Sequence, residues 1–231
     1  MPSELTRRKF LGTAGTVAAG AGASVALAAD SAEPSAEKSV KILGICCSPR
    51  KGQTTATALK ICLMAAEEAG VEIEMIELAG MQIPGEPAAG VPLAPGQQDD
   101  FPQLVPKISD PKVAGLIIGT PVYFGNMSFL CKALLDRFMA FRKDFALSDK
   151  VAGVVAVGGG RNGGQELTIR SVHTCLMGQG MIIVGDGPPT GHWGGTVWGG
   201  APGGVTEDEF GLSTARNLGR HVAEVALKMH G

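Results

Sequence analysis

The sequence predicts an α/β fold in which a doubly wound, five-stranded parallel sheet is covered by helices on both faces. Short apolar runs alternate with amphipathic stretches from residue 39 onward, which is the pattern of buried strands and surface helices. Strands joined through helices pair in parallel by right-handed crossovers, and the natural order for five of them is 2-1-3-4-5. The 34 glycines among 231 residues gather mostly between the apolar runs, as expected of loops in which backbones approach closely.

The first half of this domain is predicted to hold two strands and two helices. A continuous apolar run, SVKILGICC, predicts a buried strand, whereas the alternation in VEIEMIEL predicts an edge strand. Between them Leu59, Leu63 and Ala66 form one apolar stripe, and Gly70 follows as a helix stop. We therefore expect a strand over 39–47, a helix over 54–69, a strand over 71–78, a loop over 80–98 and a short helix over 99–109.

The second half repeats the pattern with three more apolar runs. VAGLIIGTP, KVAGVVAVGGG and GMIIVGD each predict a buried strand, and amphipathic stretches follow them. A glycine-rich segment then precedes an alanine-rich helix that closes the domain. We expect strands over 113–121, 150–160 and 180–186, helices over 128–142, 165–178 and 206–230, and a loop over 187–205.

The beginning of the chain predicts an export signal. The paired Arg7 and Arg8 precede a weakly hydrophobic, glycine-rich stretch and the A-x-A run Ala26-Leu27-Ala28, which is typical of a twin-arginine signal. An ordinary secretory leader is the alternative, and cleavage after Ala28 or after Ala29 fits equally. We expect a twin-arginine signal peptide over 1–29, a polar linker over 30–38, one domain over 39–231, and a periplasmic or otherwise exported protein.

Composition excludes several classes of function. A formal net charge of −2 gives no electrostatic basis for nucleic-acid binding, and nothing after residue 30 predicts a membrane span. The five cysteines have no C-x-x-C spacing, so we expect buried thiols and no metal site. We also interpret Asp136 and Arg137 as a pair on a helix surface, and His173 as a surface or packing residue.

Three loops at the carboxyl ends of predicted strands carry the candidate chemistry, because ligands of such sheets bind at that edge. CCSPRKGQTT (46–55) combines hydroxyls, the Arg50 guanidinium and a helix N-terminus, which suits a phosphate. GTPVYFGNMS (119–128) places Tyr123 and Phe124 on a turn that could hold a flat heterocycle, or else pack inward. GGGRNGGQE (158–166) has five glycines in nine residues, which favours close backbone approach to a ligand.

These loops, together with GMIIV and GGTVWGG, make the sequence resemble flavodoxin-fold FMN proteins over nearly all of residues 40–231. The similarity is to the tryptophan-repressor-binding-protein family of NAD(P)H:quinone oxidoreductases and to the NADPH-dependent FMN reductase and iron–sulfur flavoprotein group. The resemblance implies a flavodoxin-like fold, FMN as cofactor and NAD(P)H as a possible donor.

The resemblance also assigns residues by position. It implies that Ser48, Arg50, Gly52, Gln53, Thr54 and Thr55 hold the FMN phosphate. It implies that Pro121, Val122, Tyr123, Phe124, Gly125 and Asn126 line the isoalloxazine ring and its polar edge. It implies that Gly158, Gly159, Gly160, Arg161, Gly163 and Gly164 pass along the ribityl chain and the ring.

Two departures from the family pattern bear on function. The loop after the second strand has no cysteine, so we expect no iron–sulfur cluster. A family histidine that contacts nicotinamide or quinone is replaced by Gln179, which becomes a candidate substrate contact. His192 and Trp193 are further candidates, and packing between subunits is the alternative role for their loop. We expect no acid–base catalytic residues.

Three functions compete at this point. The first is an FMN oxidoreductase that takes electrons from NAD(P)H or another donor and passes them to a quinone-like acceptor. The second is an exported, flavodoxin-like electron carrier between redox proteins, and the third is a paralogue that has lost its flavin. Because Trp193 and Trp198 are costly to leave in water, we also expect a homotetramer or homodimer.

Overall fold

The structure is a computed structural model that describes residues 39–231. The predicted signal peptide and linker lie outside the described residues. The sheet has the order β2-β1-β3-β4-β5 with all pairs parallel, as predicted. The strands on this path are β1 (Lys41–Cys46), β2 (Glu72–Glu77), β3 (Val113–Pro121), β4 (Val151–Gly158) and β5 (Ile182–Ile183).

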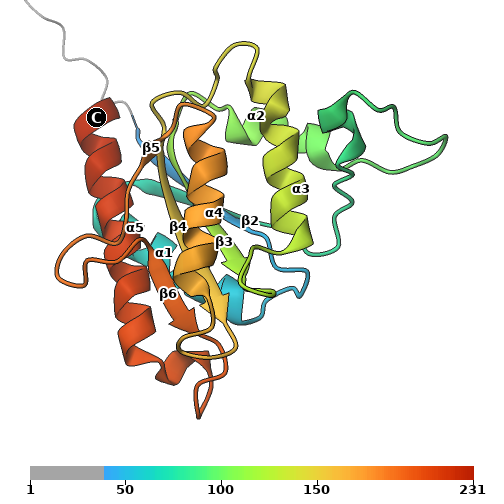
Figure 1. The fold of residues 1–231 in the computed structure, drawn as a ribbon. Coiled ribbons are helices and arrows are strands. Elements are labelled where there is room, and N and C mark those ends of the chain that lie inside the picture. The colour runs from blue at the N-terminus through green and yellow to red at the C-terminus, as the bar shows by residue number, and fades with distance from the viewer. Residues whose placement is uncertain (1–38) are drawn as a thin grey trace, which may run out of the picture. The chain divides into compact units, whose positions relative to one another are not determined.

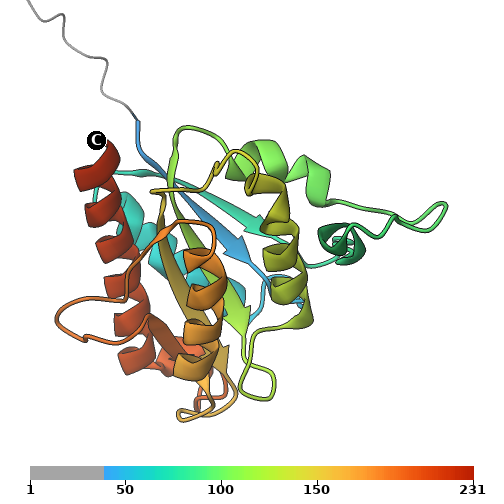
Figure 2. The same cartoon turned by 45° about the horizontal axis from the view of Figure 1, so that its top comes forward.

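Helices cover both faces of the sheet (Figures 1 and 2). One apolar cluster joins Leu43 and Ile118 to α2 (Val105–Ile108), α3 (Phe129–Arg137) and α4 (Gln165–Met177). The other joins Ile42 and Ile117 to α1 (Thr54–Glu68) and α5 (Glu209–His230). Neighbouring strand residues thus point into opposite clusters, which explains why the central strands are apolar throughout. No helix in residues 39–231 is both long and apolar enough to cross a bilayer.

The fifth position of the sheet differs from the prediction. The segment 180–186 contributes only β5, which pairs with Val151 and Ala152 at the start of β4. The chain then leaves the sheet over residues 184–194 and returns as β6 (Gly195–Trp198), which pairs with the second half of β4. A side chain at Gly194 would overlap the carbonyl oxygen of Val154, so this return needs glycine. The prediction of a continuous strand over 180–186 was wrong, and the segment predicted as a loop over 187–205 contains the strand β6.

The excursion over residues 184–194 has its own anchors. The carboxylate of the fully buried Asp186 accepts hydrogen bonds from the Thr190 hydroxyl at 2.5 Å and from the His192 backbone N–H. Thr190 in turn accepts from the Asn217 amide of α5 at 2.8 Å, and His221 of α5 bonds the Gly185 carbonyl at 2.9 Å. The excursion is therefore fixed against α5.

The long connection after β2 is held by Arg137. Its guanidinium donates to both oxygens of Asp99, at 2.9 and 2.8 Å, and to the Pro84 carbonyl at 2.9 Å. Burial would raise the pKa of Asp99, but the Arg137 bonds hold it below its usual value. The expected pairing of Arg137 with Asp136 was wrong: Asp136 pairs with Lys132 on the surface of α3. Short helical turns over Glu86–Ala89, Phe101–Gln103, Phe138–Phe141 and Val205–Glu207 complete the fold.

Candidate functional site

The three predicted loops meet at the carboxyl edge of the sheet. The Ser128 hydroxyl, which caps α3, donates to the Cys47 carbonyl at 2.7 Å and so joins the first loop to the second. A Cβ at Gly164 would lie 3.1 Å from the Cα of Gly125, so the second and third loops are in contact. A fourth segment joins them after β6, where a Cβ at Gly199 would lie 3.3 Å from the Thr54 hydroxyl.

The first loop presents an open helix N-terminus. Gln53, the N-cap residue of α1, makes no side-chain capping bond, and the first turn contains no acidic residue. The backbone N–H groups of the first turn of α1 are therefore available to an anion, which the positive end of the helix dipole also attracts. The buried Ser48 hydroxyl accepts from the Arg50 N–H at 3.1 Å and shapes the loop, while Arg50 itself is exposed.

One carboxylate borders this anion site and was missed by sequence reasoning. Glu77, the last residue of β2, accepts a hydrogen bond from the Gly52 N–H at 2.8 Å. Gly52 has a φ of 66°, which glycine adopts without strain. The register that pairs β1 with β2 brings Glu77 opposite Cys46, so only the sheet topology could have revealed this contact.

The second loop is a tight turn that exposes an aromatic ring. Tyr123 and Asn126 exchange backbone hydrogen bonds of 2.8 and 3.0 Å across Phe124 and Gly125. Phe124 has a φ of 50°, a rare conformation for a bulky residue, and its side chain is fully exposed. Tyr123 is 41% exposed. Phe124 does not pack inward, so an aromatic surface is available to stack on a flat ligand.

The third loop is closed by a residue that the sequence did not single out. The Gln165 side chain accepts from the Gly163 N–H at 2.8 Å and donates to the carbonyls of Gly160 and Val197 at 2.7 and 3.2 Å. It is almost fully buried. Gly159 and Gly160 face open space, since a Cβ at either would meet nothing within 4 Å. The motif GGQE in the sequence could have pointed to this residue. Its glutamine side chain fixes the backbone conformation of the glycine-rich loop.

Arg161 is turned away toward the last helix. Its guanidinium forms an ion pair with the buried Asp208, which also accepts from the Trp198 N–H at 2.6 Å. The guanidinium carbon lies 5.7 Å from the ring centres of both Trp198 and Phe210. The Trp198 indole donates to the Gly159 carbonyl at 2.8 Å. Arg161 and Trp198 therefore brace the third loop from outside.

The structure does not bring the three candidate substrate residues to these loops within one chain. Gln179 follows the far end of α4, whereas the third loop lies at its beginning (Figure 1). His192 and Trp193 belong to the excursion over 184–194 and line a separate cavity beside α4.

The cysteines are structural in this part of the chain. All five are free thiols, and four of them are buried. Burial raises the pKa of Cys46 to about 11, which keeps the thiol protonated near neutral pH. Within residues 39–231, no three His, Cys, Asp or Glu side chains gather as the ligands of a metal ion would.

FMN fits the residues at this edge. The uncapped N-terminus of α1 and the exposed Arg50 match a phosphate, the open backbone of Gly159 and Gly160 leaves room for close approach, and Phe124 offers a ring surface. Three of the predicted cofactor contacts already have partners within the chain: the Arg161 guanidinium pairs with Asp208, the Gly52 N–H bonds Glu77, and the Ser48 hydroxyl bonds the Arg50 backbone.

Comparisons with known proteins agree with FMN as the cofactor. Residues 40–193 match the family model described as NADPH-dependent FMN reductase. The chain is similar to an iron–sulfur flavoprotein of Methanocaldococcus jannaschii, with 42% identity over 191 residues that cover 80% of this chain and 97% of that protein. It is also similar to an iron–sulfur flavoprotein of Methanosarcina thermophila, with 36% identity over 193 residues that cover 80% and 95%.

A solved structure supports the fold and the expected flavodoxin-like class. The Trp repressor binding protein of Bacillus subtilis is 25% identical, with a TM-score of 0.52 over 78% of this chain and 98% of that one. The family match and the geometry of the loops both indicate FMN as the cofactor. The protein is a flavin-dependent oxidoreductase. The chain belongs to the NADPH-dependent FMN reductase family.

Proposed function

We propose that this protein oxidises NAD(P)H and passes the electrons to a small quinone-like acceptor. The observation that carries the proposal is the exposed turn at Phe124 beside the open glycines of the third loop. A flavin ring that stacks on Phe124 would keep its other face for a second flat molecule. A small-molecule donor and acceptor could use that side in turn.

The chain's own residues bind and orient the cofactor. The N–H groups at the start of α1, with Arg50, would hold the FMN phosphate. The Phe124 turn and the backbone of Gly159 and Gly160 would fix the ring, and the buried Gln165 keeps that backbone in place. Bound FMN supplies the two-electron redox chemistry. The protein's part is orientation and electrostatics, with no acid–base residue required.

The test is consumption of NADH or NADPH by purified, FMN-loaded protein, with and without a soluble quinone such as menadione. We expect slow oxidation alone and a marked acceleration by the quinone. The rival electron carrier would ignore NAD(P)H yet exchange electrons with a reduced redox protein. That combination would contradict the proposal.

We further propose export by the twin-arginine route. The support is the paired Arg7 and Arg8 ahead of a weakly hydrophobic stretch. That route carries folded proteins, so FMN would be inserted before export.

A further inference from the structure

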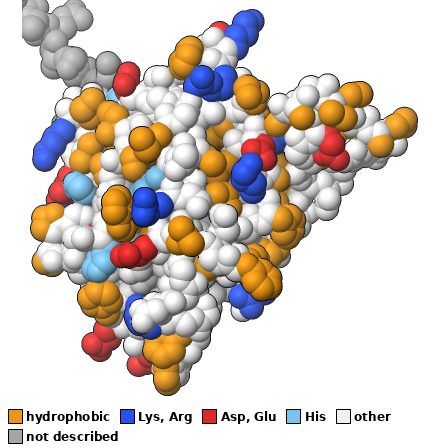
Figure 3. Space-filling model, in the orientation of Figure 1, with side chains coloured by type: hydrophobic (Ala, Val, Ile, Leu, Met, Phe, Trp, Pro, Cys, Tyr) orange, Lys and Arg blue, Asp and Glu red, His pale blue; other side chains and the backbone are white. Residues whose placement is uncertain are grey.

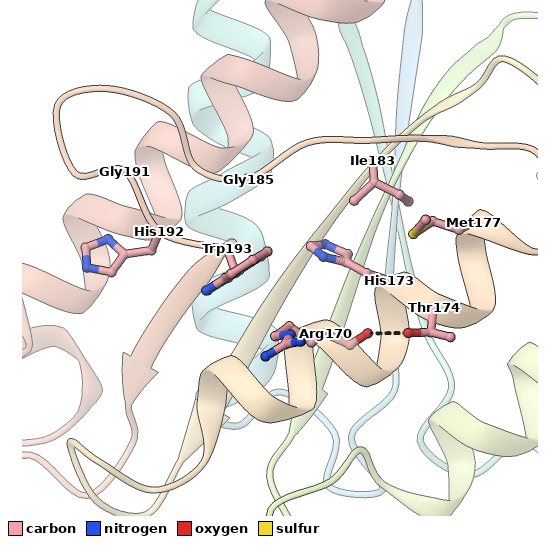
Figure 4. Close-up of a pocket in the computed structure, with 9 residues that line it drawn as sticks. All are labelled: Arg170, His173, Thr174, Met177, Ile183, Gly185, Gly191, His192 and Trp193. Atoms are coloured by element: carbon pink, nitrogen blue, oxygen red, sulfur yellow. Dashed lines mark hydrogen bonds between the residues drawn. The ribbon is translucent and has the colours of Figure 1, made fainter. Parts of the chain in front are cut away.

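A second cavity lies apart from the flavin loops, between α4 and the excursion over 184–194 (Figure 4). Its volume is about 690 Å³, within the range of small-molecule sites. The α4 residues that line it recur at helical spacing, so one face of the helix forms the wall. The lining residues are Arg170, His173, Thr174, Met177, Ile183, Gly185, Gly191, His192 and Trp193.

His173 is the unusual group in this cavity. Its side chain is 6% exposed, and its Nε2 has no hydrogen-bond partner among the described residues. Burial lowers the pKa of His173 to about 4, so the imidazole is neutral near pH 7. A buried imidazole without a partner is unfavourable, and a ligand could supply the missing bond.

A cation and an aromatic ring lie next to this histidine. The Arg170 guanidinium sits over the Trp193 ring, with its central carbon 5.2 Å from the ring centre. Trp193 is 54% exposed, and no carboxylate within the described chain forms an ion pair with Arg170. Figure 4 shows both side chains near His173, and Figure 3 shows basic, histidine and hydrophobic groups close together on this face. The site therefore offers positive charge beside a flat apolar surface.

We propose that this cavity is a binding site for a planar aromatic carboxylate. Arg170 would pair with the carboxylate, since a guanidinium fork matches its two oxygens. The aromatic body would lie against Trp193, Met177 and Ile183, and His173 would bond a polar atom of the ligand. The proposed site does not require bound flavin, because none of its lining residues belongs to the three flavin loops.

Calorimetric titration of the FMN-loaded full chain tests the proposal. The probes are benzoate, naphthoate and neutral naphthamide, which differ in ring area or in charge alone. We expect one naphthoate to bind per chain, more tightly than benzoate. Naphthamide should bind about tenfold more weakly or worse, because it lacks the charge-assisted contact.

Three variants locate the binding. Arg170→Gln should weaken naphthoate about tenfold or more and leave naphthamide unchanged. His173→Phe should weaken both ligands without lowering the melting temperature, because it removes an unpartnered polar atom. Arg216→Gln, at an exposed arginine of α5 outside this cavity, is the matched control and should bind like the parent.

The proposal is overturned if folded protein binds neither benzoate nor naphthoate at millimolar concentration. It is also overturned if Arg170→Gln and Arg216→Gln weaken naphthoate equally. The remaining alternative is that this face is a contact between copies of the chain, and sedimentation tests it. That alternative would hold if the protein binds no probe and if an oligomer of the parent dissociates in the Arg170→Gln variant.

Discussion

Arg50 is the residue on which recognition of the FMN phosphate depends most directly. It is exposed beside the uncapped start of α1. We expect Arg50→Ala to weaken FMN by about 1.5–3 kcal/mol, the usual contribution of a hydrogen bond to a charged group. Riboflavin, which lacks the phosphate, should lose little. Fluorescence titration of both flavins measures the difference, with Lys60→Ala on α1 as a charge control, and equal losses would place Arg50 outside the site.

His173 makes stability depend on pH. Its pKa is lowered by burial from the ordinary 6.5 to about 4, so the unfolded chain binds the proton more readily. The folded state should lose stability as pH falls from about 6.5 to 4, by up to about 3 kcal/mol from this group. The nearby charged or titratable groups are Arg170 on the same helix and His192 on the facing excursion.

Urea unfolding of the parent and of His173→Phe across this pH range measures the effect. The parent should lose more stability than the variant toward low pH. Parallel curves would show that His173 keeps an ordinary pKa.

For individual residues, the sequence predicted which loop residues face the site but not which side chains pair with one another. Ser48 and Phe124 could be singled out because they follow predicted strands. The Arg161–Asp208 and Arg137–Asp99 pairs could not, because their members are 47 and 38 residues apart and meet only in the folded chain. Gln165 was overlooked because a glutamine at a helix start carries no distinctive chemistry by itself.

Among the elements, the split fifth strand is the part that periodicity could not predict. Strands β1, β3 and β4 are continuous apolar runs and were predicted within a few residues. GMIIVGD has the same pattern, yet only two of its residues pair with β4. The pairing of Gly195–Trp198 depends on where the excursion returns, which tertiary contacts with α5 decide.

Asp186 should hold that excursion together. We expect Asp186→Ala to lower stability by about 1–3 kcal/mol, because it leaves the Thr190 hydroxyl and the His192 N–H without their acceptor. Hydrogen exchange should rise over 184–194 and β6 and stay unchanged in β1. Asp136→Ala, at a surface ion pair, is the control and should cost under about 1 kcal/mol. Unchanged exchange in 184–194 would show that the α5 contacts suffice.

At the scale of the whole molecule, several aromatic side chains remain in contact with solvent. Phe129, Phe145 and Phe210 are all more than half exposed. Assembly would bury such groups, so we predict a homotetramer, or at least a homodimer. Light scattering with and without FMN measures the mass, and a monomer at every concentration would contradict the prediction. Trp198 supports assembly less than the sequence suggested, because its indole is hydrogen bonded and half-buried within the chain.

Export is a second property of the whole chain. Arg7→Lys combined with Arg8→Lys should retain the protein in the cytoplasm, because the twin-arginine pathway reads the arginine pair. Cell fractionation measures the distribution. Unchanged export of the double variant would favour an ordinary secretory leader.

The most direct test of the account is anaerobic reduction of the bound flavin. The full-length protein, loaded with FMN, is mixed with NADH or NADPH without oxygen while the flavin absorbance is followed, and menadione is then added. We predict that the flavin bleaches with the nicotinamide and regains its colour with the quinone. A protein that binds no FMN, or a bound flavin that neither nicotinamide reduces, would contradict the account.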